Sequence, residues 1–106
     1  MTEYRLVLTT VPDEELGRRI ARTLVEERLA ACVNVGPAVT SFYWWDKKLV
    51  EDGERLIFIK TKAAVLDRLA ARIKELHPYE VPEFISLPVA SGSPEYLGWL
   101  EAETKD

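Results

Sequence analysis

Apolar and polar positions along the chain follow two alternating periods, which predict strands and helices in a fixed order. Residues 4–11 alternate at every second position and are rich in β-branched residues, so they predict a strand. Asp13 is the expected cap of a helix whose apolar stripe continues, at helical spacing, to Leu29. A second strand region follows over residues 31–45, with a bulge expected at Gly36-Pro37.

The second half of the chain repeats these two periods. Asp46-Lys47-Lys48 predicts a turn, and the return strand spans residues 49–61, with an irregularity expected at Asp52-Gly53. Both faces of this return strand are largely apolar, which is typical of a central strand. The remaining elements are a second helix over residues 63–76, a fourth strand over 83–90 and a last helix that begins at Pro94 with Ser93 as its cap.

The resulting order, β-α-β-β-α-β-α, predicts an α+β fold. Two split β-α-β units joined by a hairpin are typical of a ferredoxin-like sandwich, here with an extra C-terminal helix. Right-handed crossovers then give an antiparallel sheet of order 4-1-3-2, with its helices on one face. We expect residues 1–106 to form one such domain, because their number is the usual size of a single domain.

The hairpin between the second and third strands is longer than the strands beside it, so its tip is expected to project beyond the sheet. Its first arm carries Phe42, Tyr43, Trp44 and Trp45. Successive strand residues face opposite sides, so these rings lie on both faces and one layer of helices covers only one of them. Exposed apolar area of this kind is typical of an interface, and the pattern therefore predicts an oligomer.

Composition and charge narrow the class of protein. Lys and Arg total 14 against 18 for Asp and Glu, a net charge of -4, which argues against a nucleic-acid partner. No apolar run approaches the roughly 20 residues of a membrane-spanning helix, and residues 1–5 lack the pattern of a secretory signal. Cys32 is the only cysteine, so no internal disulfide forms. We therefore expect a cytoplasmic protein without a membrane partner.

Five segments together resemble the CutA family of divalent-cation tolerance proteins. In chain order they are Leu29-Ala30-Ala31-Cys32-Val33-Asn34, Ser41-Phe42-Tyr43-Trp44-Trp45, Ile59-Lys60-Thr61, His77-Pro78-Tyr79-Glu80-Val81-Pro82-Glu83 and Tyr96-Leu97-Gly98-Trp99-Leu100. The resemblance implies a ferredoxin-like homotrimer whose long hairpins cross between subunits. It also implies a cytoplasmic protein that binds copper or another divalent cation and supports metal tolerance, with no established catalysis.

The resemblance further implies positions for metal ligands. In copper-binding bacterial members these are a cysteine late in the first strand and two adjacent histidines that end the second helix, and they correspond to Thr9, Leu76 and His77. Only His77 is a good ligand, because hydroxyl and aliphatic groups bind soft metals poorly. Glu83 is expected at the same end of the sheet, and Cys32 at the opposite end. The alternatives are a helix-terminal histidine and a small buried cysteine without a metal.

Other polar residues allow functions of other classes. Thr10, Tyr79 and Glu80 are expected close to His77. A buried lysine requires a partner, so Lys60, which interrupts the apolar central strand, is expected to pair with a carboxylate such as that of Glu54 or to bind an anion. The cationic residues expected to form such an anion site are Arg5, Arg55 and Lys60.

Two alternative functions follow. One is a trimeric small-ligand sensor that resembles the PII signalling proteins, although the chain has no Gly-rich phosphate loop. The other is a structural trimer that anchors another protein. An enzyme is not expected, since no nucleophile elbow or serine–histidine–acid order occurs.

Overall fold

Residues 3–106, which the computed structural model describes, form four strands and three α-helices in the predicted order. The elements are β1 (Tyr4–Val11), α1 (Glu14–Glu26), β2 (Cys32–Trp45), β3 (Lys48–Lys62), a single 3₁₀ turn η1 (Ala63–Val65), α2 (Leu66–Leu76), β4 (Ile85–Pro88) and α3 (Pro94–Glu103). The strands lie in the order β2-β3-β1-β4, and each pair is antiparallel. This confirms the ferredoxin-like α+β fold and its strand order.

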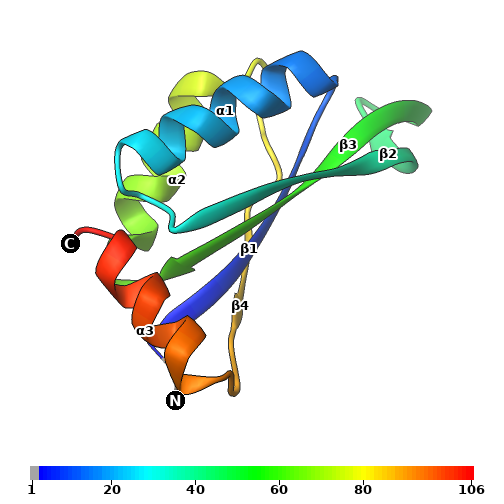
Figure 1. Ribbon diagram of the computed structural model, residues 1–106. Helices are drawn as coiled ribbons and strands as arrows, with labels where there is room; N and C mark the ends of the chain where they lie inside the picture. Colours follow the sequence, from blue (N-terminus) through cyan, green and yellow to red (C-terminus); the bar gives the residue numbers. More distant parts are fainter. Residues whose placement is uncertain (1–2) are drawn as a thin grey trace.

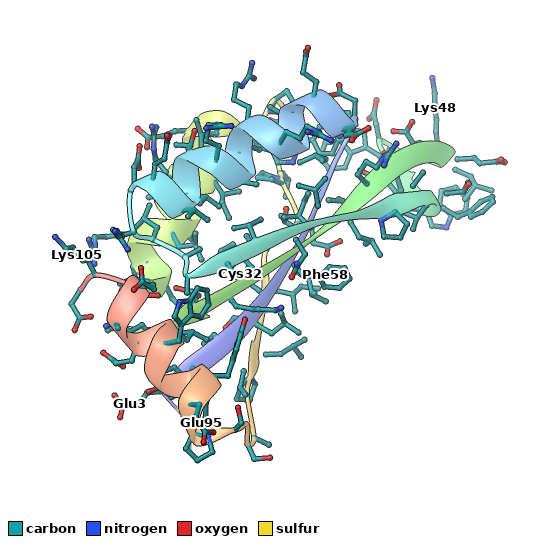
Figure 2. The ribbon with its side chains drawn as sticks, in the orientation of Figure 1. Glu3, Cys32, Lys48, Phe58, Glu95 and Lys105 are labelled. Atoms are coloured by element: carbon teal, nitrogen blue, oxygen red, sulfur yellow. The ribbon has the colours of Figure 1, made fainter. Side chains whose placement is uncertain are left out.

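The core lies between one face of the sheet and the two longer helices, α1 and α2, which lie side by side over it (Figure 1). Alternate residues of β1 and β3 point into this core, because successive side chains of a strand face opposite sides. Its fully buried members include Val7, Val11, Ile57 and Ile59 from the strands and Ile20, Leu24 and Leu69 from the helices. Phe58, between two core residues, points to the face that α1 and α2 leave open (Figure 2).

The caps and the end of α2 lie where the sequence predicts, but α2 begins at Leu66 and not at residue 63, because residues 63–65 form the separate 3₁₀ turn η1. The Asp13 carboxylate accepts a hydrogen bond from the Leu16 amide at 2.8 Å and caps α1. The Ser93 hydroxyl accepts one from the Tyr96 amide at 3.2 Å at the start of α3. α2 ends at Leu76, and His77 has an extended backbone because it precedes Pro78.

The hairpin contains one irregularity instead of two. The pairing of β2 with β3 shifts between Val35 and Ala38, which confirms the bulge at Gly36-Pro37. The irregularity expected at Asp52-Gly53 is wrong, since these residues pair regularly with Ser41 and Thr40. The one extra residue lies on β2, so β3 continues without a break.

The fourth strand is shorter than the predicted 83–90. β4 pairs with β1 only from Ile85, opposite Leu8, to Pro88, opposite Arg5. Phe84 lies outside the ladder and packs against the core instead. Pro88, the last residue of β4, has no amide hydrogen to donate to the ladder. The segment from His77 to Glu83 therefore crosses the end of the sheet as a loop.

The hairpin extends well past its neighbours, as the sequence predicts. β2 and β3 have 14 and 15 residues, whereas β1 and β4 have 8 and 4. The tip projects away from the helices (Figure 1), and its rings are exposed, with Phe42 at 64% and Trp44 at 72% of their full accessible area. Within residues 3–106, every helix is too short or too polar to cross a membrane.

Candidate functional site

Two pockets lie at the end of the sheet where His77 follows α2. The first, of about 410 Å³, lies between the start of α1 and the end of α2 and is lined by Asp13, Leu76 and His77 among others. The second, of about 630 Å³, lies where the hairpin meets the loop after α2. We call it the Glu54 pocket, and its lining includes Thr10, Tyr43, Trp45, Glu54, Tyr79 and Glu83.

His77 holds this loop to the sheet through both ring nitrogens. Its Nε2 lies 2.7 Å from the backbone carbonyl oxygen of Thr10, to which it donates, and its Nδ1 accepts the Tyr79 amide at 3.2 Å. This pattern fits the neutral ring with its proton on Nε2. The ring is buried and stacks at a tilt on Tyr79, with 4.5 Å between the centroids. A metal ion would bind His77 only by replacing one of these hydrogen bonds.

The other positions implied by the resemblance do not converge on His77. Leu76 lines the first pocket together with His77. Thr9, however, is fully buried beneath the helices, and its hydroxyl has no hydrogen-bond partner. Cys32 pairs with Lys60 in the ladder, whereas Thr10 pairs with Leu56, so the cysteine lies towards the other end of the sheet as expected. In the part of the chain from residue 3 onward, no group of three or more His, Cys, Asp or Glu side chains is placed to hold a metal.

The sequence indicates Glu54 only as a partner of Lys60, and the structure gives it a different partner and a place in a pocket. Its residue is 6% exposed, and its carboxylate accepts the hydroxyl of Tyr79 at 2.9 Å. The expected pair between Glu54 and Lys60 is wrong, because the Lys60 ammonium lies over the ring of Tyr96, 5.9 Å from its centroid. The two partners of the real pair are 25 residues apart, and only the loop across the sheet end brings them together.

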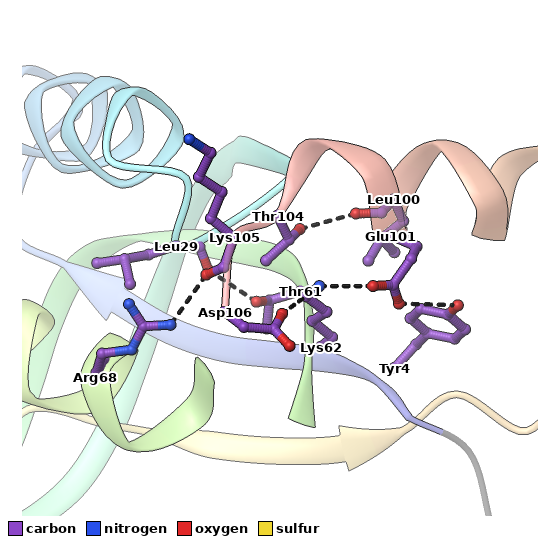
Figure 3. A network of polar contacts seen from close by, with 10 residues as sticks. All are labelled: Tyr4, Leu29, Thr61, Lys62, Arg68, Leu100, Glu101, Thr104, Lys105 and Asp106. Atoms are coloured by element: carbon purple, nitrogen blue, oxygen red, sulfur yellow. Dashed lines mark hydrogen bonds and ion pairs between the residues drawn. The ribbon is translucent and has the colours of Figure 1, made fainter. Parts of the chain in front are cut away.

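On the face of β3 that carries Lys60, the buried lysine is Lys62, two residues further along the strand. Its ammonium binds the carboxylates of Glu101 at 2.7 Å and Asp106 at 2.5 Å (Figure 3). Residues 60 and 62 share a face because the strand period is two. The sequence shows that shared face, but α3 and the chain end determine which of the two lysines is covered.

The three cationic residues considered for an anion site do not share one site, since Arg5 and Lys60 are neighbours in the ladder but face opposite sides of the sheet. Arg55 pairs with Glu14 at 3.6 Å, Lys60 lies over Tyr96, and Arg5 is in register with Thr61 at the far end of β1. None of the three lines the Glu54 pocket. The arrangement therefore offers no shared cationic pocket for a phosphate group.

Tyr79 holds its proton more tightly than an ordinary tyrosine. Burial raises the pKa of the phenol, and the hydrogen bond to Glu54 with that carboxylate's negative charge raises the pKa further. The phenol therefore acts as a donor to Glu54 over the whole physiological pH range.

We expect the Tyr79→Phe variant to be less stable than the parent by about 1–2 kcal/mol at pH 8, because the Glu54 carboxylate loses its donor. The unfolded phenol ionises near pH 10 while the folded one stays protonated, so the tyrosine's contribution to stability falls as the pH rises above about 10. Urea unfolding between pH 8 and 11 should then show a shallower alkaline loss for the variant than for the parent. Parallel curves would contradict the assignment.

Comparison with known proteins gives one consistent family. A family model described as CutA1 divalent ion tolerance protein matches residues 5–103. The divalent-cation tolerance protein CutA of Thermus thermophilus is 54% identical over 99 residues, which are 93% of this chain and 96% of that protein. The chloroplastic protein CutA 1 of rice is 45% identical over 101 residues, and this chain spans 57% of its length.

Solved structures show the same relationship in three dimensions. The crystal structure of CutA1 from rice superposes with a TM-score of 0.96 at 43% identity, covering 99% of this chain and 96% of that one. The divalent cation tolerance protein of Thermus thermophilus superposes with a TM-score of 0.94 at 52% identity, covering 96% and 99%. Fold, sequence and the ordered set of motifs thus agree, and the chain belongs to the CutA1 family of divalent ion tolerance proteins.

Proposed function

We propose that this protein binds copper or another divalent cation and supports tolerance to it as a cytoplasmic homotrimer, without catalysing a reaction. The observation that carries the proposal is the family match over residues 5–103, since members carry the description of divalent ion tolerance. The cytoplasmic assignment is supported by Cys32, which is unpaired in the structure and suits a reducing compartment.

The exposed apolar surface supports the trimer. The projecting hairpin exposes the rings of Phe42, Trp44 and Trp45, and the uncovered face of β4 adds Ile85 and Leu87. Soluble monomers rarely leave such area open to water, because apolar surface gains free energy when it is buried. Neighbouring copies of the chain are the proposed cover of Trp44, Ile85 and Leu87, which lie outside the Glu54 pocket.

Assembly also bears on the proposed metal site. Residues 3–106 of one chain hold no ready group of three ligands, so we propose that the ion takes ligands from more than one subunit. Glu83 lines the Glu54 pocket, and the half-buried Cys32 extends from the open face of β2. Both side chains lie where a neighbouring copy can add ligands, whereas His77 must first give up a hydrogen bond.

Calorimetric titration of the metal-free protein with Cu(II) tests this proposal. We expect saturable binding that weakens at least tenfold in one or more of the variants His77→Ala, Cys32→Ser and Glu83→Gln, because removing one ligand of a small set costs much of the affinity. Thr9→Val is the matched control, since its buried hydroxyl has no partner and is a poor ligand. Circular dichroism melts confirm that each variant is folded.

Two results would contradict the proposal. If no saturable binding is seen, the protein does not bind this metal. If binding is unchanged by all three substitutions, these residues are not the ligands.

Light scattering on the same samples should give three times the 12.1 kDa mass of the chain. A monomer at micromolar concentration would contradict the assembly.

A small-ligand sensor is the second candidate function, and the Glu54 pocket is the observation that favours it. The Glu54 pocket is an open surface pocket of about 630 Å³ that joins aromatic walls to carboxylates. This is the size and mixed character of small-molecule sites in proteins.

A further inference from the structure

We propose that the Glu54 pocket binds a small organic cation, one that joins an ammonium or guanidinium group to an apolar part. This inference goes beyond metal tolerance and names the ligand class for the sensor function. The pocket lies on the open side of the sheet, between the base of the hairpin and the loop after α2. Its chemistry comes from one buried carboxylate, a set of rings and a lack of positive charge in its lining.

The buried carboxylate of Glu54 calls for a cation. The residue is 6% exposed, and the donor that reaches it is the neutral hydroxyl of Tyr79. Within residues 3–106, no Lys, Arg or His side chain forms an ion pair with Glu54. Removing a carboxylate from water is costly unless a cation compensates it, so buried carboxylates are normally paired. A ligand's ammonium or guanidinium group would complete this pair.

The walls of the pocket suit the rest of such a ligand. The rings of Phe42, Tyr43, Trp45 and Tyr79 line it, and ring faces attract cations while they bury apolar groups. Burial raises the pKa of the Tyr43 phenol, and the negative charges of Asp52 and Glu54 raise it further. The electrostatic potential at these walls is therefore negative, which favours a cation.

The same lining disfavours the other ligand classes. Glu80 and Glu83 add two more carboxylates, and no Lys, Arg or His is among the lining residues, so an anion would be repelled. Within residues 3–106 of one chain, these acidic side chains do not form a group of three metal ligands. A bare divalent ion would also leave the aromatic walls unused. A larger cation with an apolar part contacts both the carboxylates and the rings.

Titration with benzylamine tests the inference, with benzyl alcohol as the neutral molecule of the same shape. Calorimetry on the assembled full-length chain uses phosphate buffer with a chelator at pH 7, because amine buffers would compete and metal ions must be absent. We expect benzylamine to saturate one site per chain with a dissociation constant of about 1 mM or tighter, which is reasonable for eight heavy atoms. Benzyl alcohol should bind at least tenfold more weakly.

Two isosteric substitutions on β3 distinguish the effect of the Glu54 charge on binding from the effect of the protein's net charge. Glu54→Gln should weaken benzylamine at least tenfold and leave benzyl alcohol unchanged, because it removes the charge at the pocket alone. Glu51→Gln removes the same charge from an exposed residue outside the pocket, opposite Phe42 in the ladder, and should change the affinity less than twofold. Trp45→Leu provides a second pocket variant in case Glu54→Gln fails to fold, and should weaken benzylamine by removing a ring.

Three results would overturn the inference. They are equal affinity for benzylamine and benzyl alcohol, an equal response to Glu54→Gln and Glu51→Gln, and no saturable binding. The last would also be the result if a basic side chain of a neighbouring subunit already filled the pocket. Since the titration contains no metal, its failure leaves the copper titration of the proposed function to be decided separately.

Discussion

Removing both carboxylates that hold Lys62 is expected to lower the free energy of unfolding by about 2 kcal/mol. The lysine side chain is 7% exposed, and its ammonium contacts Glu101 and Asp106 directly (Figure 3). A buried ammonium without a counter-charge typically costs about 3–5 kcal/mol. We expect less here, because the two carboxylates are 49% and 70% exposed and water can reach the ammonium once they are gone.

The double variant Glu101→Ala with Asp106→Ala provides this test, by urea unfolding at one fixed chain concentration. Lys62→Met is the matched variant, since it keeps the apolar stem and removes the charge. We expect Lys62→Met alone to be nearly neutral, and the triple variant to recover most of the stability lost by the double variant. If the triple variant is no more stable than the double one, the loss comes from α3 itself and not from the unpaired charge.

The pH dependence of this ion-paired group has a definite sign. The hydrogen bonds that the Lys62 ammonium donates, first to Asp106 and second to Glu101, raise the pKa of Lys62. A raised pKa in the folded state stabilises the protein at neutral pH, and the stabilisation is lost as the pH rises above the unfolded lysine value of about 10.4. The difference between the parent and the double variant should therefore shrink in strongly alkaline solution.

Gly36→Ala is expected to cost about 2 kcal/mol, the second large effect. A Cβ atom built at Gly36 would lie 2.8 Å from the backbone oxygen of Leu56 and 3.1 Å from the Phe58 ring. The nearer atom belongs to the central strand β3 and is fixed in the sheet. Overpacking against fixed atoms typically costs about 1–3 kcal/mol. The bulge at the base of the hairpin therefore requires glycine for space.

Gly53→Ala on the facing strand is the control. A Cβ atom at Gly53 would have no neighbour within 4 Å, so the expected change lies within about 0.5 kcal/mol of zero. Both variants are compared by urea unfolding at the same chain concentration, because the stability of the proposed trimer would depend on concentration. Equal destabilisation by the two substitutions would mean that close packing at the bulge does not explain the requirement.

Local chemistry accounts for the parts of the fold that the sequence predicts correctly. Asp13 caps α1 through a bond to a residue three positions away, and Pro78 ends α2 through its immediate neighbour. The alternation of β1 is equally local. The right-handed crossover rule then orders the strands without any knowledge of side-chain contacts. Each of these features follows from interactions over a few residues or from a general rule of topology.

Several side-chain pairings with a partner distant in the sequence, unlike the strand order, do not follow from the sequence. The ladder of β4 with β1 covers only residues 85–88, with one further bond from the Val89 amide to the Tyr4 carbonyl oxygen. Lys60 and Lys62 have the same strand pattern, and α3 determines which of them is buried. The pair of Glu54 with Tyr79 forms because a loop returns across the end of the sheet. No local pattern encodes such distances, since they depend on how complete elements pack.

The sequence by itself thus determined the family, the ferredoxin-like topology and the projecting aromatic hairpin, because periodicity, capping and ordered motifs are properties of the chain. It also placed Thr10, Tyr79, Glu80 and Glu83 near His77, and they lie at that end of the sheet. Only the tertiary structure showed that both nitrogens of His77 are already bonded and that a buried carboxylate faces an aromatic pocket. The physical reason is that burial and pairing belong to the packed molecule, in which residues far apart in sequence share one desolvated space.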